Sequence, residues 1–199
     1  MAITADLKRC SIAAKFEGQL FEIHENVNTP TYLVKLARDL CSRNKIDLQK
    51  IDRIITASGP GSFTGIRTAQ SFVKGLSLAL KIPAACASYF QVIKNLFGKT
   101  SKQKNDLVAI IKSEKNQVYF HDFATGNFGV SSYDSLEKML DSEPNRPLAG
   151  DKIDEILQNT KREFFEIKDY KNAKNFLELT EYEPKVAPLY INVRACNNG

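Results

Sequence analysis

The first hundred residues alternate between short apolar segments and longer segments with a helical period. Strands are predicted where apolar residues run together or alternate with polar ones, and helices where apolar residues recur every three or four positions. The predicted order is β-β-β-α-β-α-β-α, with strands at residues 2–5, 10–16, 18–25, 52–57 and 83–87 and helices at residues 29–43, 64–80 and 89–97. This alternation is typical of an α/β domain.

The second half repeats part of this pattern in a weaker form. Strands are predicted at residues 107–111 and 117–123, a turn at Gly126-Asn127, and helices at residues 135–140, 153–160 and 173–179. Residues 99–105 are polar and have no apolar period, so we interpret them as a linker. We therefore predict two related domains, residues 1–98 and a smaller, reduced copy at residues 106–199.

A glycine-rich turn follows the strand at residues 52–57. Gly59, Pro60, Gly61 and Gly65 favour a tight strand-to-helix turn, because glycine allows positive φ and close backbone approach. Phosphate binding at the following helix N-terminus is the alternative. The spacing Gly59-x-Gly61-x-x-x-Gly65 is one residue too long for G-x-G-x-x-G, and no Gly-Lys-Ser/Thr ends a Walker-type loop.

Three residues near this turn and near the N-terminus are candidates for phosphate or Mg²⁺ contacts. Gly61 and Ser62 lie in the turn, and Asp6 follows the first predicted strand. Their structural alternatives are a turn glycine, a helix N-cap hydroxyl and a hairpin-end carboxylate. Ser62 is not in a nucleophile elbow, because Pro60 stands where that motif has glycine.

The helix predicted at residues 64–80 has two distinct faces. One broad apolar stripe, which we expect to pack on the sheet, consists of Ile66, Ala69, Phe72, Val73, Leu76, Ala79 and Leu80. The opposite side carries Arg67, Ser71, Lys74, Gly75 and Leu78. Ser71 and Gly75 are one turn apart, so another helix could approach closely there.

The helix predicted at residues 29–43 has a wide apolar arc. Thr29 is its predicted N-cap and Pro30 its first residue. The arc covers about half of the circumference, which is more than one core contact needs; it consists of Tyr32, Leu33, Val34, Leu36, Ala37, Leu40 and Cys41. Two interpretations stay open, a helix packed between its own sheet and a neighbour, or a partner surface.

Composition and charge describe an ordinary globular protein. Of its 199 residues, 43% are hydrophobic and 26% charged, and no apolar run approaches the roughly 20 residues that span a bilayer. The four cysteines lie far apart, so we expect reduced thiols and a cytoplasmic protein.

The charge is distributed unevenly along the chain. Residues 1–100 carry 14 Lys and Arg against 7 Asp and Glu, and the remainder 14 against 16. We interpret this basic half as a solvated surface rather than an RNA-binding site.

Metal and hydrolase chemistry find little support in the sequence. The two histidines, His24 and His121, are far apart, and no H-x-x-x-H or Cys/His cluster exists. A peptidase would need Ser62 brought together with one of these histidines and an acid by folding.

One string of residues carries a family resemblance. The sequence GPGSFTGIRTA at residues 59–69, the hairpin-like residues 6–14, Asn116-Gln117-Val118-Tyr119, and Pro188-Leu189-Tyr190-Ile191-Asn192 resemble the TsaB (YeaZ) family of tRNA threonylcarbamoyladenosine biosynthesis proteins. That family belongs to the actin/Hsp70/sugar-kinase superfamily. The resemblance implies an α/β, actin-like (ribonuclease H-like) fold with two related domains, each a mixed sheet flanked by helices.

The resemblance also implies a function. Members of this family are non-catalytic subunits that bind and activate TsaD, which carries the metal-binding H-x-x-x-H, in a complex with the ATPase TsaE. The complex makes N6-threonylcarbamoyladenosine next to the anticodon of tRNA. It implies a homodimer when TsaD is absent, tRNA contact only through the complex, no membrane, no cofactor of the chain's own, and ATP or ADP at the junction with the partner as a further expectation. The implied partner surface consists of Tyr32, Leu33, Leu36, Ala37, Leu40, Arg67, Ser71, Lys74, Gly75 and Leu78.

Two alternatives of other classes remain. An ATP-dependent small-molecule kinase of the same superfamily would need an acidic residue followed by a hydroxyl-rich phosphate turn. Here Asp6 is followed by Leu7-Lys8-Arg9, a shorter turn without those hydroxyls. A glycoprotease-like peptidase is the other alternative.

Overall fold

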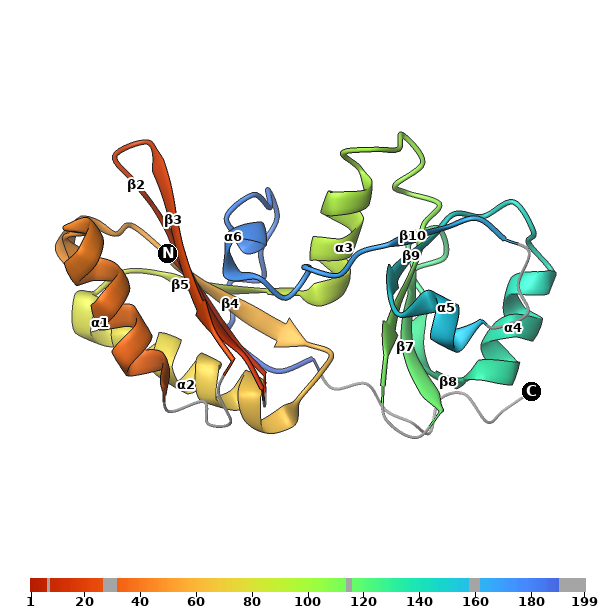
Figure 1. The fold of residues 1–199 in the computed structure, drawn as a ribbon, viewed down its shortest axis with the longest axis horizontal. Helices are drawn as coiled ribbons and strands as arrows, with labels where there is room; N and C mark the ends of the chain where they lie inside the picture. Colours follow the sequence, from red (N-terminus) through yellow and green to blue (C-terminus); the bar gives the residue numbers. More distant parts are fainter. Residues whose placement is uncertain (7, 27–31, 114–115, 158–161, 190–199) are drawn as a thin grey trace. The chain divides into compact units, whose positions relative to one another are not determined.

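The chain folds into two units of similar plan. The computed structural model describes residues 1–6, 8–26, 32–113, 116–157 and 162–189. Unit 1 comprises Met1–Val92 and Lys171–Leu189, and unit 2 comprises Ile93–Tyr170. Each contains a five-stranded sheet with helices packed on it (Figure 1).

The sheet of unit 1 mixes antiparallel and parallel pairs. Its strands are β1 (Ala2–Ala5), β2 (Cys10–Phe16), β3 (Gln19–Glu25), β4 (Ile54–Gly59) and β5 (Ala84–Ser88), in the order β3-β2-β1-β4-β5. The β1–β2 and β2–β3 pairs are antiparallel, whereas β4 runs parallel to both β1 and β5. All residues of β1 and β4 are buried, as expected for central strands covered on both faces.

Helices cover both faces of this sheet (Figure 1). On one face lie α1 (Leu33–Asn44) and α2 (Phe63–Leu80), which share a core with Cys10, Ile12 and Ala14 of β2. The short α6 (Ala173–Phe176) packs on β2 and β1 from the other face, where the Ala173 N–H donates to Ser11 Oγ at 3.0 Å. Ser11 and Ile12 point to opposite faces because side chains alternate along a strand. A single 3₁₀ turn, η2 (Leu48–Lys50), lies between α1 and β4.

Unit 2 repeats the topology of unit 1. Its strands are β6 (Val108–Lys112), β7 (Gln117–Asp122), β8 (Phe128–Ser132), β9 (Leu148–Asp151) and β10 (Phe164–Glu166), in the order β10-β9-β6-β7-β8. Again the first three strands are antiparallel neighbours and the last two are parallel additions. Helices α4 (Tyr133–Asp141) and α5 (Ile153–Ile156) share a core with Val118 and Phe120 of β7. The prediction of two related α/β units is confirmed.

Several element boundaries differ from the prediction. The strands β8, β9 and β10 were not predicted, because each has at most five residues and little alternation. Helix α6 ends at Phe176 rather than at residue 179, and α5 covers Ile153–Ile156. The predicted helix start at Thr29-Pro30, the end of the 153–160 helix and most of the segment 188–192 lie outside the described residues.

The observed units also depart from the predicted domains 1–98 and 106–199 with a linker at 99–105. The change from unit 1 to unit 2 falls within α3 (Tyr89–Phe97), so the predicted linker lies inside unit 2. The Phe97 ring packs edge-on against Phe165, with centroids 4.9 Å apart. Since local polarity carries no information about such contacts, sequence alone could not find this boundary.

The segment Lys171–Leu189 returns to unit 1. Cys86 in β5 and Glu183 exchange two backbone hydrogen bonds of 2.9 and 2.8 Å. The Tyr89 ring contacts Phe176 edge-on, with centroids 5.7 Å apart. The free edge of β5 is thereby covered, which a sheet edge requires to avoid unwanted pairing.

None of the described helices is both long enough and apolar enough to span a membrane.

A buried ion pair ties one end of the unit 2 sheet together. The Arg146 guanidinium donates to both carboxylate oxygens of Asp122, and their side chains are 15% and 8% exposed. Asp122 also accepts the backbone N–H groups of Ala124 and Thr125, and Arg146 Nε donates to the Asp106 carbonyl at 3.2 Å. Hydrogen bonds from Arg146 hold the pKa of Asp122 well below its usual range.

We expect Arg146→Met to destabilise unit 2 by about 3–5 kcal/mol, because it leaves the Asp122 carboxylate buried without its cation. The pKa of Asp122 is depressed in the folded state, so its stabilisation is present above the unfolded pKa of about 4 and is lost as pH falls below it. The variant should therefore lose less stability than the wild type between pH 5 and pH 3 (about one pH unit on either side of that value). Urea denaturation at several pH values measures both effects.

Lys112→Met is the matched control. It breaks the more exposed Lys112–Glu155 pair, whose side chains are 32% and 45% exposed, and should leave the free energy of unfolding nearly unchanged. Equal losses for the two variants would contradict a special role for the buried pair.

Candidate partner interface

The glycine turn determines where α2 begins. The strand β4 ends at Gly59, whose φ of 117° lies in the region that favours glycine. The Ser62 hydroxyl then accepts the Gly65 N–H at 3.2 Å, which is the hydrogen bond of a helix N-cap. Pro60 and Gly61 connect these two points. The structural interpretation of Gly59, Pro60, Gly61 and Ser62 thus accounts for the geometry of the turn.

Gly65 is required for a different reason from Gly59. A Cβ at Gly65 would lie 2.7 Å from Asp6 Cα and 2.8 Å from the Ala5 carbonyl oxygen. The first turn of α2 therefore lies directly against the end of β1. One turn further on, the buried Gln70 donates from Nε2 to the Ala57 carbonyl at 3.1 Å, which fixes α2 on β4 as well.

The outward side of α2 carries the residues that its helical period predicted. Arg67, Ser71, Lys74, Gly75 and Leu78 are all exposed. Leu78 is 80% exposed, and a Cβ at Gly75 would have no neighbour within 4 Å. An exposed leucine beside an open glycine leaves room for another backbone to approach α2 closely.

The structure adds two exposed apolar residues that were not among the predicted partner residues. Phe63 is 58% exposed, with the Arg67 guanidinium stacked 4.0 Å above its ring centroid. Val34 on α1 is 63% exposed. The signal for Phe63 was its position one helical turn before Arg67, at spacing i, i+4. Exposed aromatic and arginine side chains are the residue types that most often anchor protein interfaces.

Three of the five predicted partner residues on α1 are buried within this chain. Leu33, Leu36 and Leu40 are only 1–2% exposed and belong to the core of unit 1. Tyr32 and Ala37 are partly buried and pack against the same core. The reason is that α1 contacts β2, β3 and α2 together, so most of its wide apolar arc, Val34 excepted, packs within the chain.

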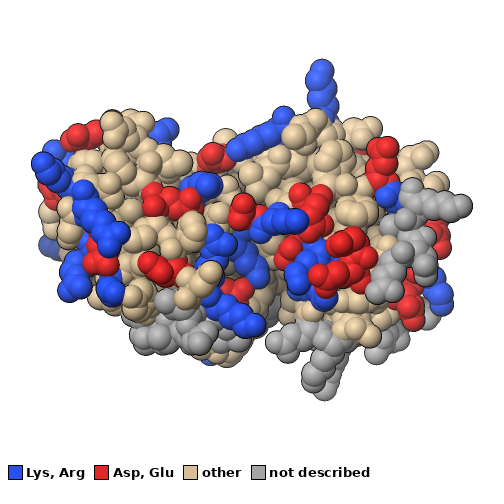
Figure 2. All heavy atoms as spheres, viewed as in Figure 1, with Lys and Arg blue, Asp and Glu red and all other residues tan. Residues whose placement is uncertain are grey.

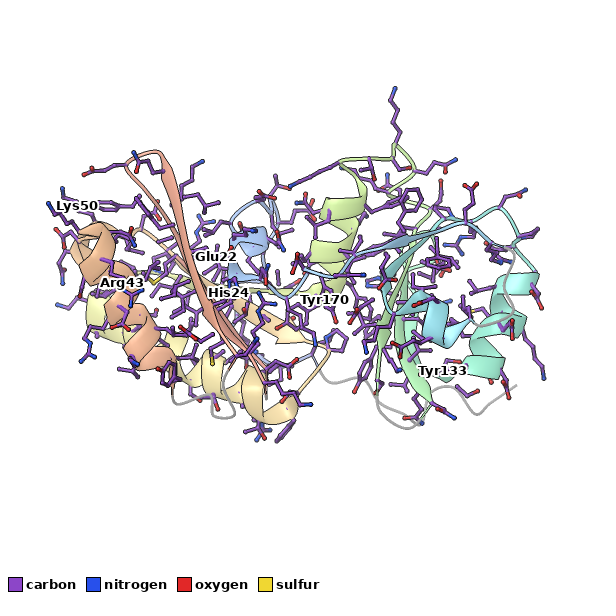
Figure 3. The ribbon with its side chains drawn as sticks, in the orientation of Figure 1. Glu22, His24, Arg43, Lys50, Tyr133 and Tyr170 are labelled. Atoms are coloured by element: carbon purple, nitrogen blue, oxygen red, sulfur yellow. The ribbon has the colours of Figure 1, made fainter. Side chains whose placement is uncertain are left out.

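The outer side of α1 is instead mainly polar and basic. Lys35, Arg38 and Ser42 are exposed there, beside Val34. The one carboxylate of α1, Asp39, lies 3.8 Å from Arg38, and α2 contains no acidic residue. Figure 2 shows Lys and Arg side chains gathered over α1, and Figure 3 labels Arg43 near the end of that helix. Together the exposed sides of α1 and α2 form a basic surface with apolar anchors, which we call the α2 face; it consists of Val34, Lys35, Arg38, Phe63, Arg67, Ser71, Lys74, Gly75 and Leu78.

The candidate phosphate and Mg²⁺ residues have structural partners. The Asp6 carboxylate accepts from Lys171 Nζ at 2.7 Å, and Thr4 Oγ1 donates to the Lys171 carbonyl at 2.8 Å. The Asp6 carboxylate therefore already has a cationic partner within the chain. The Ser62 hydroxyl is used by the α2 cap, and Gly61 lies within the turn.

The two histidines lie on strands of different units. His24 stands opposite Ser11 in the β2–β3 register, on the face of the sheet that carries Glu22 (Figure 3). His121 on β7 stacks on Phe123 with centroids 4.1 Å apart, and burial lowers its pKa. Among the described residues, no three His, Cys, Asp or Glu side chains are grouped to hold a metal ion.

A comparison with known families decides the relationship. The profile of TsaD, tRNA N6-adenosine threonylcarbamoyltransferase, matches residues 30–180, from before α1 to beyond α6. The chain belongs to the TsaD family.

Within this family, its similar curated proteins are all TsaB. The tRNA threonylcarbamoyladenosine biosynthesis protein TsaB of Buchnera aphidicola subsp. Baizongia pistaciae is 24% identical over 98% of each chain. TsaB of Escherichia coli is 24% identical over 72% of this chain and 62% of its own. YeaZ from Pseudomonas aeruginosa has a TM-score of 0.74 at 21% identity, covering 96% of this chain and 98% of that chain. The predicted resemblance to TsaB (YeaZ) and the predicted actin-like fold are confirmed.

Shortening a buried leucine of α1 and an exposed leucine of α2 should affect the free energy of unfolding differently. We expect Leu36→Ala to destabilise unit 1 by about 2–5 kcal/mol, because it opens a cavity in the core. Leu78→Ala removes a side chain that is 80% exposed and should change stability by no more than about 0.5 kcal/mol. Chemical denaturation followed by circular dichroism compares them. A core-like loss at Leu78 would mean that this residue is packed within the chain.

Two glycines of α2 provide a second matched pair. Gly65→Ala should cost about 1–3 kcal/mol, because the added methyl collides with the backbone of Ala5 and Asp6. Gly75→Ala fills open space and should stabilise the helix by about 0.5–1 kcal/mol. Thermal denaturation of both variants tests this contrast, and a Gly65→Ala protein as stable as Gly75→Ala would refute the close approach.

Proposed function

We propose that this chain is the non-catalytic subunit that binds and activates TsaD in the complex that makes N6-threonylcarbamoyladenosine next to the anticodon of tRNA. The observation that carries the proposal is the α2 face, where Phe63, Gly75 and Leu78 stay exposed although their helix is firmly packed on its own sheet. A rigid helix with exposed apolar side chains and an open glycine is a surface suited to a second helix.

The similarity to known proteins supports tRNA threonylcarbamoylation as the reaction and TsaD as the partner. The matched family is that of the transferase TsaD, and the curated relatives bear the name of tRNA threonylcarbamoyladenosine biosynthesis protein TsaB. An isologous interface uses the same surface patch on two identical subunits, and two subunits of the same fold can approximate this arrangement. We therefore propose that the α2 face takes the corresponding helices of TsaD, or those of a second copy of this chain when TsaD is absent.

The chemistry in this proposal belongs to the partner. In this chain Asp6 forms an ion pair with Lys171, and the Ser62 hydroxyl accepts the N-cap hydrogen bond of α2, so both residues have structural roles. Catalysis and metal binding would lie in TsaD, with TsaE as the ATPase, with ATP or ADP held at the junction with the partner, and with the whole complex acting on tRNA in the cytoplasm.

The charge of the α2 face indicates what the partner surface should look like. Lys35, Arg38, Arg67 and Lys74 surround the apolar anchors, and Asp39 is the one carboxylate within α1 and α2. Complementary charge raises association rates and orients partners. The contacting surface of TsaD should therefore be apolar at its centre and acidic at its rim, and salt should slow association.

Gly75 offers the sharpest test of this interface. We expect Gly75→Leu to stay folded, because a side chain there points into open space and leucine favours helix. The leucine would occupy the position of the partner backbone and should abolish co-elution with TsaD in size-exclusion chromatography. Modification of tRNA should fall in cells that depend on this chain.

Gly75→Ala is the matched control, and it should keep TsaD binding within a few-fold of the wild type, since a methyl group adds little bulk. Circular dichroism establishes that both variants are folded. A folded Gly75→Leu protein that forms the TsaD complex at wild-type affinity would place the interface elsewhere.

A further inference from the structure

One end of unit 2 gathers a lysine-rich loop and an aromatic cluster. Residues 98–106 lead into β6, and residues 123–127 follow β7. These two segments are neighbours, because the Phe123 N–H donates to the Leu107 carbonyl at 3.0 Å and Val108 pairs with Asp122. Residues that are far apart in the sequence therefore share one surface.

The loop is basic and ordered. Lys99, Lys102 and Lys104 are exposed, and Asp106 is the one carboxylate between residues 98 and 106. Thr100 and Ser101 donate their backbone N–H groups to the Phe97 carbonyl, both at 3.0 Å, so the loop folds back on the end of α3. An ordered loop loses less entropy when its lysines bind a ligand.

The aromatic cluster lies on the adjoining strand ends. His121 stacks on Phe123 at 4.1 Å with an interplanar angle of 16°, and it lies 5.7 Å from the Phe128 ring. Phe128 is 49% exposed. Lys94 Nζ lies 4.4 Å from the centroid of the Phe123 ring. Because Lys94 belongs to α3, this contact links α3 to the aromatic cluster.

We propose that this end of unit 2, which we call the lysine–aromatic end (Lys94, Lys99, Lys102, Lys104, His121, Phe123 and Phe128), contacts RNA directly. The lysines would neutralise backbone phosphates, and the exposed Phe128 ring would stack on an unpaired base. This inference rests on the proposed function, which supplies tRNA as the RNA. It departs from the expectation that tRNA is contacted only through the other subunits.

RNA fits this surface better than an acidic protein does. Exposed aromatic rings beside lysines are the combination used by single-stranded nucleic acid sites, since every base offers a face for stacking. The surface also belongs to unit 2, whereas the α2 face belongs to unit 1, so the two can be altered independently.

The test uses fluorescence anisotropy of an unmodified tRNA transcript with the full chain. The triple variant Lys99→Gln, Lys102→Gln, Lys104→Gln should bind about tenfold more weakly at low salt, and its plot of log affinity against log salt should be shallower by about 2. Phe128→Ala should also weaken binding, but it should leave the salt slope unchanged because the ring carries no charge.

The matched control is Lys15→Gln, Lys50→Gln, Lys138→Gln, which removes the same charge from exposed lysines elsewhere. It should change tRNA affinity less than about threefold, because these lysines lie outside the lysine–aromatic end and would contact no phosphate there. Equal losses for both triple variants would overturn the proposal in favour of non-specific attraction.

Co-elution with TsaD separates this inference from the proposed function. Both triple variants should still bind TsaD, because the α2 face is intact in each. A lysine variant that keeps full tRNA affinity and loses TsaD or TsaE would make this surface a protein contact and overturn the inference. If the wild-type chain binds TsaD but no tRNA, the inference fails and the proposed function stands.

Discussion

The close approach of α2 to the end of β1 is the contact on which unit 1 depends. It brings the Gly65 Cα against the Asp6 backbone, where even a methyl group would collide. Gly59 turns the chain out of β4, and Ser62 caps the helix one turn before this contact. The helix is therefore fixed at its start by backbone packing and along its length by Ile66, Ala69 and Val73 in the core.

This constraint also determines what α2 can present to another protein. Because its inner side is held on β1 and β4, the opposite side must face outward, with Leu78 and Phe63 exposed. The neighbouring α1 takes the reverse role: its leucines complete the core, and its exposed side is basic. The helices α1 and α2 are thus held rigidly by the core on one side and are accessible on the other. A surface that is already ordered loses less entropy when it binds a partner.

Unit 2 has the same strand topology as unit 1, but a buried ion pair stabilises one end of its sheet. Its sheet repeats the strand plan of unit 1, but its helices α4 and α5 are short and its free end is tied by the buried Asp122–Arg146 pair. The Asp122 carboxylate closes the turn after β7 by accepting hydrogen bonds from the N–H groups of Ala124 and Thr125. That turn carries the chain from Phe123 to Phe128, so the ion pair also supports the aromatic cluster beside the lysine-rich loop.

The sequence by itself determined the element types of the first half, the duplicated plan, the turn at Gly59–Gly65 and the outward residues of α2. These follow from local rules, namely strand and helix periods and the backbone freedom of glycine. Only the tertiary structure decided that Leu33, Leu36 and Leu40 are core residues, because a wide apolar arc is compatible with two different neighbours. It also decided that residues 171–189 return to unit 1, and that Leu107, which follows the lysine-rich loop, lies beside Phe123. Those outcomes depend on contacts between residues distant in sequence, which no local pattern encodes.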